Sequence, residues 1–99
     1  PVPLGINVMK DDFGIDTIRK FDKFLQNSIQ FGLEHTNDAI DYAMEYGRGK
    51  PRDLIEKFVK MYVNDVTVNM GTDGEKSIRK IFDMAREKNL VPEFELKIA

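Results

Sequence analysis

The stretch of sequence that decides the fold is DTIRKFDKFLQNSIQFGL, residues 16–33. Apolar side chains recur there at spacings of three and four, at Ile18, Phe21, Leu25, Ile29 and Leu33. Because residues three and four apart lie on one face of a helix, this period predicts a long amphipathic helix. Asp16 stands where a capping side chain begins such a helix. The chain is therefore expected to be mainly helical.

Two shorter helices are predicted downstream, over residues 38–46 and 51–64. In both, apolar residues again return every three or four positions. Gly47 is expected to end the first helix in the left-handed conformation that glycine adopts readily. Pro51 fits the first position of the second helix, where the amide that proline lacks has no helical partner.

A fourth helix is predicted over residues 72–88, and both of its ends carry signals. Thr72 and Glu75 form a Thr-x-x-Glu capping box, in which each side chain accepts a hydrogen bond from a free amide at the helix start. Asn89 is expected to cap the other end in the left-handed conformation, with Leu90 folded back onto the last turn.

Short strands are predicted at both ends of the chain. Residues 6–9 are apolar and β-prone, and residues 93–98 alternate apolar with charged side chains, which is typical of a half-buried strand. Residues 66–70 fit either a strand or an extended linker. The resulting prediction is a mainly α fold with short flanking β-strands and about four helices, forming a single domain over residues 1–99.

The composition excludes several classes of function. The chain has 99 residues, no cysteine and one histidine, so it has no disulfide framework, no catalytic thiol and no ligand set for a zinc cluster. Its net charge of -2 gives no bulk attraction to nucleic acid or anionic membranes, and no apolar run reaches the ~20 residues of a membrane span. We expect no metal, no cofactor, no nucleic-acid partner and no membrane partner.

Two loops match ligand-binding loops only in part. Residues 49–50 supply the Gly-Lys of a phosphate loop, but Met44 stands in place of its first glycine and Pro51 in place of its hydroxyl residue. Residues 69–74 match the start of a calcium loop, but Lys80 occupies the position of the bidentate glutamate. A turn before a capped helix explains the second loop better.

The remaining polar candidates are one histidine, two carboxylate pairs and a basic loop, namely His35, Asp11 with Asp12, Asp38 with Asp41, and Arg48, Lys50 and Arg52. All lie at expected helix ends or in loops, where solvation or capping explains them better than acid–base chemistry or anion binding. Five phenylalanines are assigned to the core by their helical spacing, namely Phe21, Phe24, Phe31, Phe58 and Phe82. No catalytic residue is predicted within the chain.

Beyond these periodic patterns, three stretches resemble one known family. They are residues 1–14, which begin Pro-Val-Pro-Leu-Gly; residues 28–42, with Ser28, His35 and an Ala-Ile-Asp-Tyr turn; and residues 62–74, Tyr-Val-Asn-Asp-Val-Thr-Val-Asn-Met-Gly-Thr-Asp-Gly. In this order and spacing they resemble the final third of the 1,4-dihydroxy-6-naphthoate synthases, the cyclic de-hypoxanthine futalosine lyases of menaquinone biosynthesis. Asp11 stands where that family has an arginine, so an anion contact made by the arginine is lost.

The resemblance implies that the chain is the C-terminal fragment of a cytoplasmic lyase with two α/β lobes, like the type II periplasmic binding proteins. The family's catalytic histidine lies upstream, so the fragment is expected to be inactive alone and to meet its small-molecule substrate through the missing N-terminal portion. Pro3, Leu4 and Gly5 are expected at the crossing between the lobes, where they line the ligand cleft. A solute-binding protein of the same architecture and a free-standing helical module that forms homodimers are the alternatives.

Overall fold

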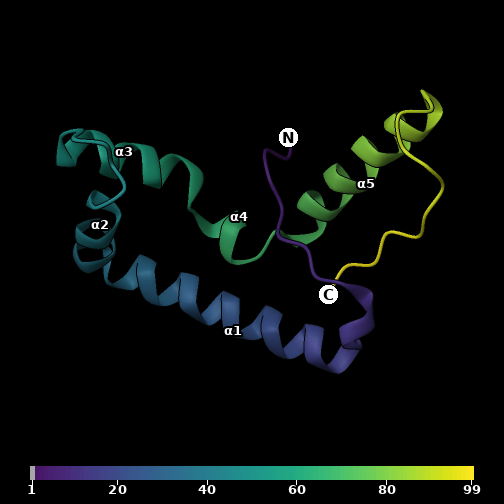
Figure 1. Ribbon diagram of the computed structural model, residues 1–99, viewed down its shortest axis with the longest axis horizontal. Coiled ribbons are helices and arrows are strands. Elements are labelled where there is room, and N and C mark those ends of the chain that lie inside the picture. The colour runs from purple at the N-terminus through teal and green to yellow at the C-terminus, as the bar shows by residue number, and fades with distance from the viewer. Residues whose placement is uncertain (1) are drawn as a thin grey trace. The chain divides into compact units, whose positions relative to one another are not determined.

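The computed structural model describes residues 2–99, which form helices joined by loops and extended ends (Figure 1). In chain order the elements are the 3-10 turn η1 (Asp11–Phe13) and the helices α1 (Ile15–Glu34), α2 (Thr36–Met44), α3 (Arg52–Tyr62), α4 (Asp65–Val68) and α5 (Gly71–Glu87). The chain divides into two compact units. Unit 1 comprises Pro1–Lys20 and Met70–Ala99, and unit 2 comprises Phe21–Asn69.

The expected β-strands are absent from residues 2–99, and this part of the fold prediction is wrong. Residues 2–9 and 93–98 are extended, but no backbone hydrogen bond within the described chain joins either segment to a neighbour. Alternating side chains suit a sheet, yet a strand exists only where a second backbone pairs with it. The described residues therefore form an all-helical fold with five α-helices and contain no strand of the expected α/β fold.

The four predicted helices are confirmed, with ends that differ by one or a few residues. α1 begins one residue before the predicted Asp16, and α5 begins one residue before the predicted Thr72. Residues 66–70, which fitted a strand or a linker, instead contribute to the short helix α4. Local periodicity therefore located the helices well and missed only this single turn.

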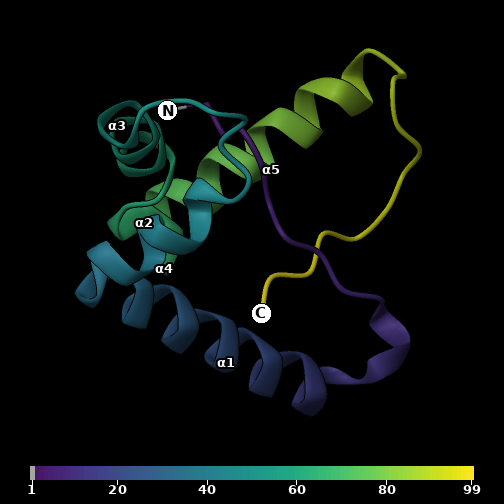
Figure 2. The same cartoon turned by 60° about the vertical axis from the view of Figure 1, so that its left-hand side comes forward.

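Unit 2 is built around α2 and α3, which pack against each other (Figure 2). Ile40 of α2 is the one fully buried side chain of the described residues, with 1% of its surface exposed. The guanidinium of Arg52, at the start of α3, donates hydrogen bonds to the Asp41 carboxylate and to the Asn37 carbonyl oxygen, the latter at 3.1 Å. The Arg52 side chain thus links α3 to α2.

The loop between α2 and α3 does not turn at the predicted glycine. Arg48 and Gly49 have φ of 51° and 75°, and the Lys50 amide donates to the Gly47 carbonyl oxygen at 3.0 Å. Positive φ at both central residues is the pattern of a type I′ turn. The left-handed prediction for Gly47 is therefore wrong. A Cβ added there would lie 2.8 Å from Ile55 Cδ1, so this glycine permits close packing.

Unit 1 contains α5, whose buried side chain is Ile78, 6% exposed. At the end of α5, Asn89 has φ of 55°; its amide donates to the Arg86 carbonyl oxygen and the Leu90 amide to the Ala85 carbonyl oxygen, both at 2.9 Å. These paired bonds are the usual cap around a left-handed residue, so the Asn89 prediction is confirmed. The Leu90 side chain stays exposed, however, and does not fold back onto α5.

The C-terminal tail, residues 88–99, is held to α5 by two arginines. The Arg86 guanidinium donates to the Phe94 carbonyl oxygen at 3.2 Å, and the Arg79 guanidinium donates to the Leu96 carbonyl oxygen at 3.4 Å. Both contacts reach main-chain atoms of the tail. The position of the tail is thus fixed mainly by its hydrogen bonds to two side chains of α5.

Most of the predicted apolar faces are exposed. Of the five phenylalanines assigned to the core, only Phe82 is half-buried, and it meets the ring of Phe94 edge-on with centroids 5.2 Å apart. The other four are exposed, namely Phe21, Phe24, Phe31 and Phe58. The helices form as their periodicity predicts, but residues 2–99 do not bury these rings. The core prediction is wrong for these four residues.

Candidate functional site

The residues expected to line a ligand cleft lie in the extended segment of unit 1. Pro3 is half-buried, and Leu4 is 80% exposed. A Cβ added at Gly5 would meet no atom within 4 Å. This segment presents accessible apolar surface.

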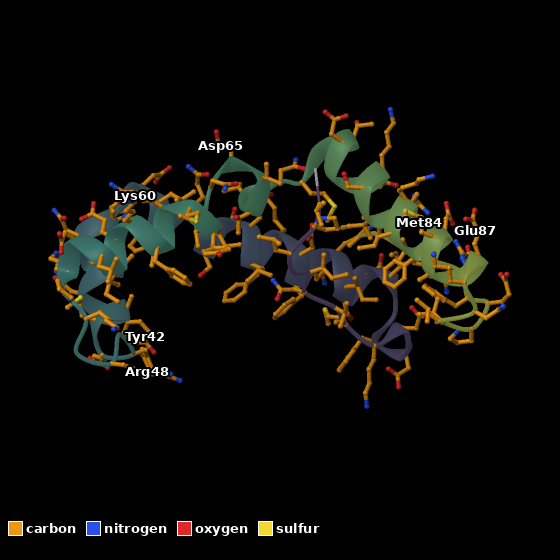
Figure 3. The ribbon with its side chains drawn as sticks, turned by 90° about the horizontal axis from the view of Figure 1, so that it is seen from above. Tyr42, Arg48, Lys60, Asp65, Met84 and Glu87 are labelled. Carbon is orange, nitrogen blue, oxygen red and sulfur yellow. The ribbon has the colours of Figure 1, made fainter. Side chains whose placement is uncertain are left out.

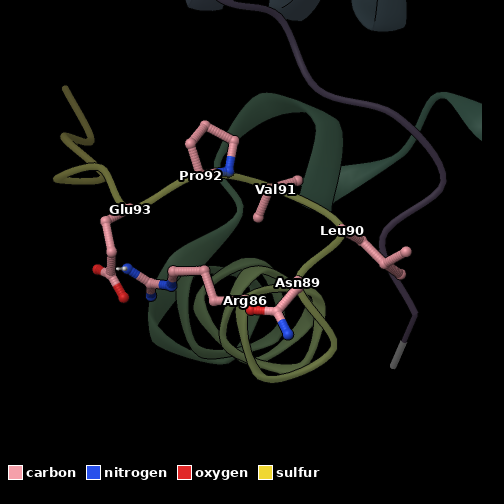
Figure 4. Close-up of a pocket in the computed structure, with 6 residues that line it drawn as sticks. All are labelled: Arg86, Asn89, Leu90, Val91, Pro92 and Glu93. Atoms are coloured by element: carbon pink, nitrogen blue, oxygen red, sulfur yellow. Dashed lines mark ion pairs between the residues drawn. The ribbon is translucent and has the colours of Figure 1, made fainter.

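A shallow hollow of about 440 Å³ at the end of α5 is lined by Arg86, Asn89, Leu90, Val91, Pro92 and Glu93 (Figure 4). Arg86 brings a positive charge to it. The Arg86 guanidinium is already bound by the Asp83 carboxylate, by the Glu93 carboxylate at 3.9 Å and by the Phe94 carbonyl oxygen. Because its charge is neutralised within the chain, the hollow offers no free cation to an anionic ligand.

His35 lies at the junction between α1 and α2 and caps the end of α1. Its Nδ1 donates to the Phe31 carbonyl oxygen at 2.8 Å, and its ring stacks on the Phe31 ring with centroids 3.9 Å apart. Because a carbonyl oxygen only accepts hydrogen bonds, Nδ1 carries a proton. The capping role expected for His35 is confirmed, and no carboxylate of residues 2–99 hydrogen-bonds to its ring.

One carboxylate of each predicted pair forms an ion pair, and so does Arg52 of the basic loop. Asp41 binds Arg52, and Asp11 accepts a hydrogen bond from the Lys97 ammonium at 3.2 Å, which raises the pKa of Lys97 above its ordinary value of 10.5. These groups are exposed, so each pair contributes little to stability.

Two further titratable contacts lie on unit 2, where Figure 3 labels Tyr42 and Lys60. The Tyr42 and Tyr46 hydroxyls are 3.2 Å apart, and the hydrogen bond between them raises the pKa of Tyr42 above its ordinary value of 10.0. The hydrogen bond from the Lys60 ammonium, 2.7 Å from the Glu56 carboxylate, lowers the pKa of Glu56. Tyr42 therefore stays protonated and Glu56 ionised at neutral pH, so neither is poised for proton transfer.

The stretch that resembles the family most closely, residues 62–74, builds α4 and leads into α5. Asn64 Oδ1 accepts a hydrogen bond from the Val66 amide at 3.0 Å, and Thr67 Oγ1 accepts one from the Asn64 amide at 3.1 Å. This reciprocal pair is a capping box. Asn64 and Thr67 thus have a structural role that requires no ligand.

The start of α5 explains the glycines of the same stretch. α5 begins at Gly71 without a side-chain cap, so the predicted capping box at Thr72 and Glu75 is wrong. Gly71 has φ of 63°, which favours glycine, and a Cβ added at Gly74 would lie 2.6 Å from Met70 Cβ. Because this backbone is helical from Gly71 onward, it does not form the open loop that wraps a calcium ion.

The described contacts assemble no self-contained reaction centre. Across residues 2–99, no group of three or more histidine, cysteine, aspartate or glutamate side chains is placed to hold a metal ion. Nor does any helix in this range combine the length and apolarity needed to cross a bilayer. Of the polar side chains singled out from the sequence, His35 caps a helix, and Asp11, Asp41 and Arg52 form ion pairs.

Comparisons with known proteins agree on one family. The model of the menaquinone biosynthesis family matches residues 1–87. The chain is 29% identical over 90 residues to the 1,4-dihydroxy-6-naphthoate synthase of Thermus thermophilus, covering 91% of this chain and 33% of that protein. It is 24% identical over 92 residues to the synthase of the same name from Streptomyces coelicolor, covering 93% and 33%. No solved structure matches the chain.

The chain therefore belongs to the menaquinone biosynthesis family, because the family model matches most of its length. It spans about a third of the length of the curated relatives it matches. The resemblance read from the sequence is confirmed. Its signal was the order of three short stretches, since helical periodicity alone occurs in many unrelated families.

Proposed function

We propose that this chain is one part of a cytoplasmic 1,4-dihydroxy-6-naphthoate synthase. The observation that carries the proposal is the similarity to two synthases of that name over more than nine tenths of the chain. The family match over residues 1–87 supports the same assignment.

The chain contributes to the synthase without supplying its catalytic groups. Its one histidine caps a helix, and the carboxylates Asp11 and Asp41 are engaged by basic side chains. The matched segment is also only a third of each relative. We place the chain as a single domain at the C-terminal end of the synthase, where the rest of the polypeptide supplies the catalytic groups. The chain is then inactive by itself.

The chain's contribution to substrate binding is assigned to Pro3, Leu4 and Gly5. Leu4 is exposed, Gly5 has open space around it and Pro3 is half-buried, so this segment can contact a small molecule held by the rest of the polypeptide. Val8, in the same extended segment, is 82% exposed and serves as a matched control for Leu4. In an active synthase, Leu4→Asp is expected to raise KM about tenfold with little change in kcat, whereas Val8→Asp leaves both unchanged.

The test is a chimera in which this chain replaces the matched third of the Thermus thermophilus synthase. The assay measures 1,4-dihydroxy-6-naphthoate formed from cyclic de-hypoxanthine futalosine. We expect product from the chimera and none from the 99-residue chain alone. A chimera that melts cooperatively and binds this substrate without turning it over would overturn the assignment and favour a solute-binding protein.

A further inference from the structure

One face of α3 is an exposed apolar surface without a partner in the described chain. Its side chains are spaced three and four residues apart, so they share one side of the helix within an arc of roughly 100°. We name this surface the α3 stripe, and it consists of Leu54, Phe58, Met61 and Tyr62. All four side chains are exposed, with Phe58 at 60% and Met61 at 61%. The Phe58 and Tyr62 rings already lie together, with centroids 4.8 Å apart.

The α3 stripe is distinct from the side of the helix that is partly covered. Ile55 and Val59 are half-buried, and the Ile55 side chain lies against Gly47 in the loop that follows α2. Lys57 and Lys60 lie on a third, polar side, where Lys60 pairs with Glu56. The helix thus has one packed side, one polar side and one apolar side left bare. A surface helix that binds no partner needs only a packed side and a polar side.

The exposed area of the chain matches what a stable interface hides. The chain exposes 8358 Å². Two separate compact globules, each with half of its 11.4 kDa, would expose roughly 7,000 Å² together. The surplus of about 1,400 Å² lies within one partner's share of a permanent interface, which is about 1,000–2,500 Å². The four exposed side chains of the α3 stripe are part of this exposed area.

We propose that the α3 stripe docks against the two thirds of the synthase polypeptide that lie outside the matched segment. The inference rests on the proposed function. The family match includes all of α3, so the relatives carry this helix together with a further stretch of chain about twice as long as the segment they share with it. That stretch presents an apolar surface to the α3 stripe and leaves Lys57 in solvent. We favour this stretch over a second copy of the chain because it belongs to the same polypeptide.

Cysteine labelling tests the docking directly, because this chain contains no cysteine of its own. Phe58→Cys probes the α3 stripe, and Lys57→Cys probes the adjacent polar side of the same helix. Both variants are made in the 99-residue chain and in the Thermus thermophilus chimera, whose remaining cysteines are replaced by serine. The measured quantity is the rate of reaction with a maleimide.

We expect similar rates for the two variants in the 99-residue chain, because both positions are exposed. In the chimera, Phe58→Cys should react at least about tenfold more slowly than Lys57→Cys, since thiol reactivity follows exposure. Equal rates in the chimera would overturn the proposal. Concentration-dependent protection of Phe58→Cys in the 99-residue chain, with equal rates in the chimera, would overturn it in favour of a second copy.

Two further measurements keep the result independent of the chimera's folding and of the proposed activity. If the chimera is insoluble, the same pair of cysteines is placed at the aligned positions of the Thermus thermophilus synthase, and equal labelling there would overturn the proposal. Product formation is assayed separately. An active chimera with a freely labelled Phe58→Cys refutes the docking alone, whereas an inactive, folded chimera with a protected one refutes the proposed activity alone.

Discussion

Replacing Ile40 with alanine tests whether unit 2 depends on its single buried side chain. Ile40 is 1% exposed. The substitution removes three carbon groups, and at about 0.8 kcal/mol for each the lost burial amounts to roughly 2.4 kcal/mol. The cavity adds little where the surroundings are half-buried and can move inward. We therefore expect the free energy of unfolding to fall by about 2–3 kcal/mol.

The assay is urea unfolding of the 99-residue chain, followed by far-ultraviolet circular dichroism. Leu54→Ala is the matched control, because it removes the same number of carbon groups from a helix of the same unit. Leu54 is 49% exposed, so its loss should be about 1 kcal/mol. Equal losses for the two variants would refute the reasoning, since they would show that burial at Ile40 carries no special weight.

Three further changes are expected to act at single sites. Gly71→Ala should lower the free energy of unfolding by about 1–2 kcal/mol in the same urea assay, because φ at Gly71 is 63°, whereas Gly5→Ala, with open space around its added Cβ, should not. Asn64→Ala should lower it by about 1 kcal/mol through loss of the capping box of α4, and an equal effect of Asn27→Ala on α1 would contradict that role. The pKa of Glu56 is lowered in the folded chain, so the ionised carboxylate stabilises the fold when the pH is above the ordinary pKa of 4.5. This stabilisation is lost as the pH falls through the lowered pKa. The urea midpoint of the unchanged chain should therefore drop more than that of Glu56→Gln between about pH 5 and about pH 3, and parallel pH profiles would exclude the effect.

Helices were the predictable part of this fold because their signals are local. The three-and-four spacing of residues 16–33 already specifies which side chains share a face, whatever the rest of the chain does. The left-handed cap at Asn89 was predictable for the same reason, since its two hydrogen bonds close within a few residues. What the spacing could not provide was the surface that each face meets.

The strands and the core failed for one shared physical reason. Alternation at residues 93–98 and periodicity around Phe58 each describe one side of a contact, and neither pattern specifies the surface on the other side. The clamp between Asp41 and Arg52 was missed similarly, because it joins two helices and has no local spacing rule. The capping box was misplaced to Thr72 because Asn64 with Thr67 carries the same kind of signal eight residues earlier.

Of the candidate site, the sequence predicted the family but not the contacts. Three ordered stretches indicated menaquinone biosynthesis, which the family match confirms. The roles of Asn64 and Gly71 within those stretches became clear only from backbone angles and hydrogen bonds. Residues that match a family motif can thus be required by the local backbone structure and have no role in substrate binding.

The arginine contacts of the C-terminal tail bear on how freely its sequence can change. Arg79 and Arg86 lie inside the region matched by the family, whereas the carbonyl oxygens that they hold, on Phe94 and Leu96, lie beyond it. Every residue type presents the same carbonyl group. Substitutions can therefore accumulate in the tail during evolution while it keeps its route along α5, provided that the two arginines remain.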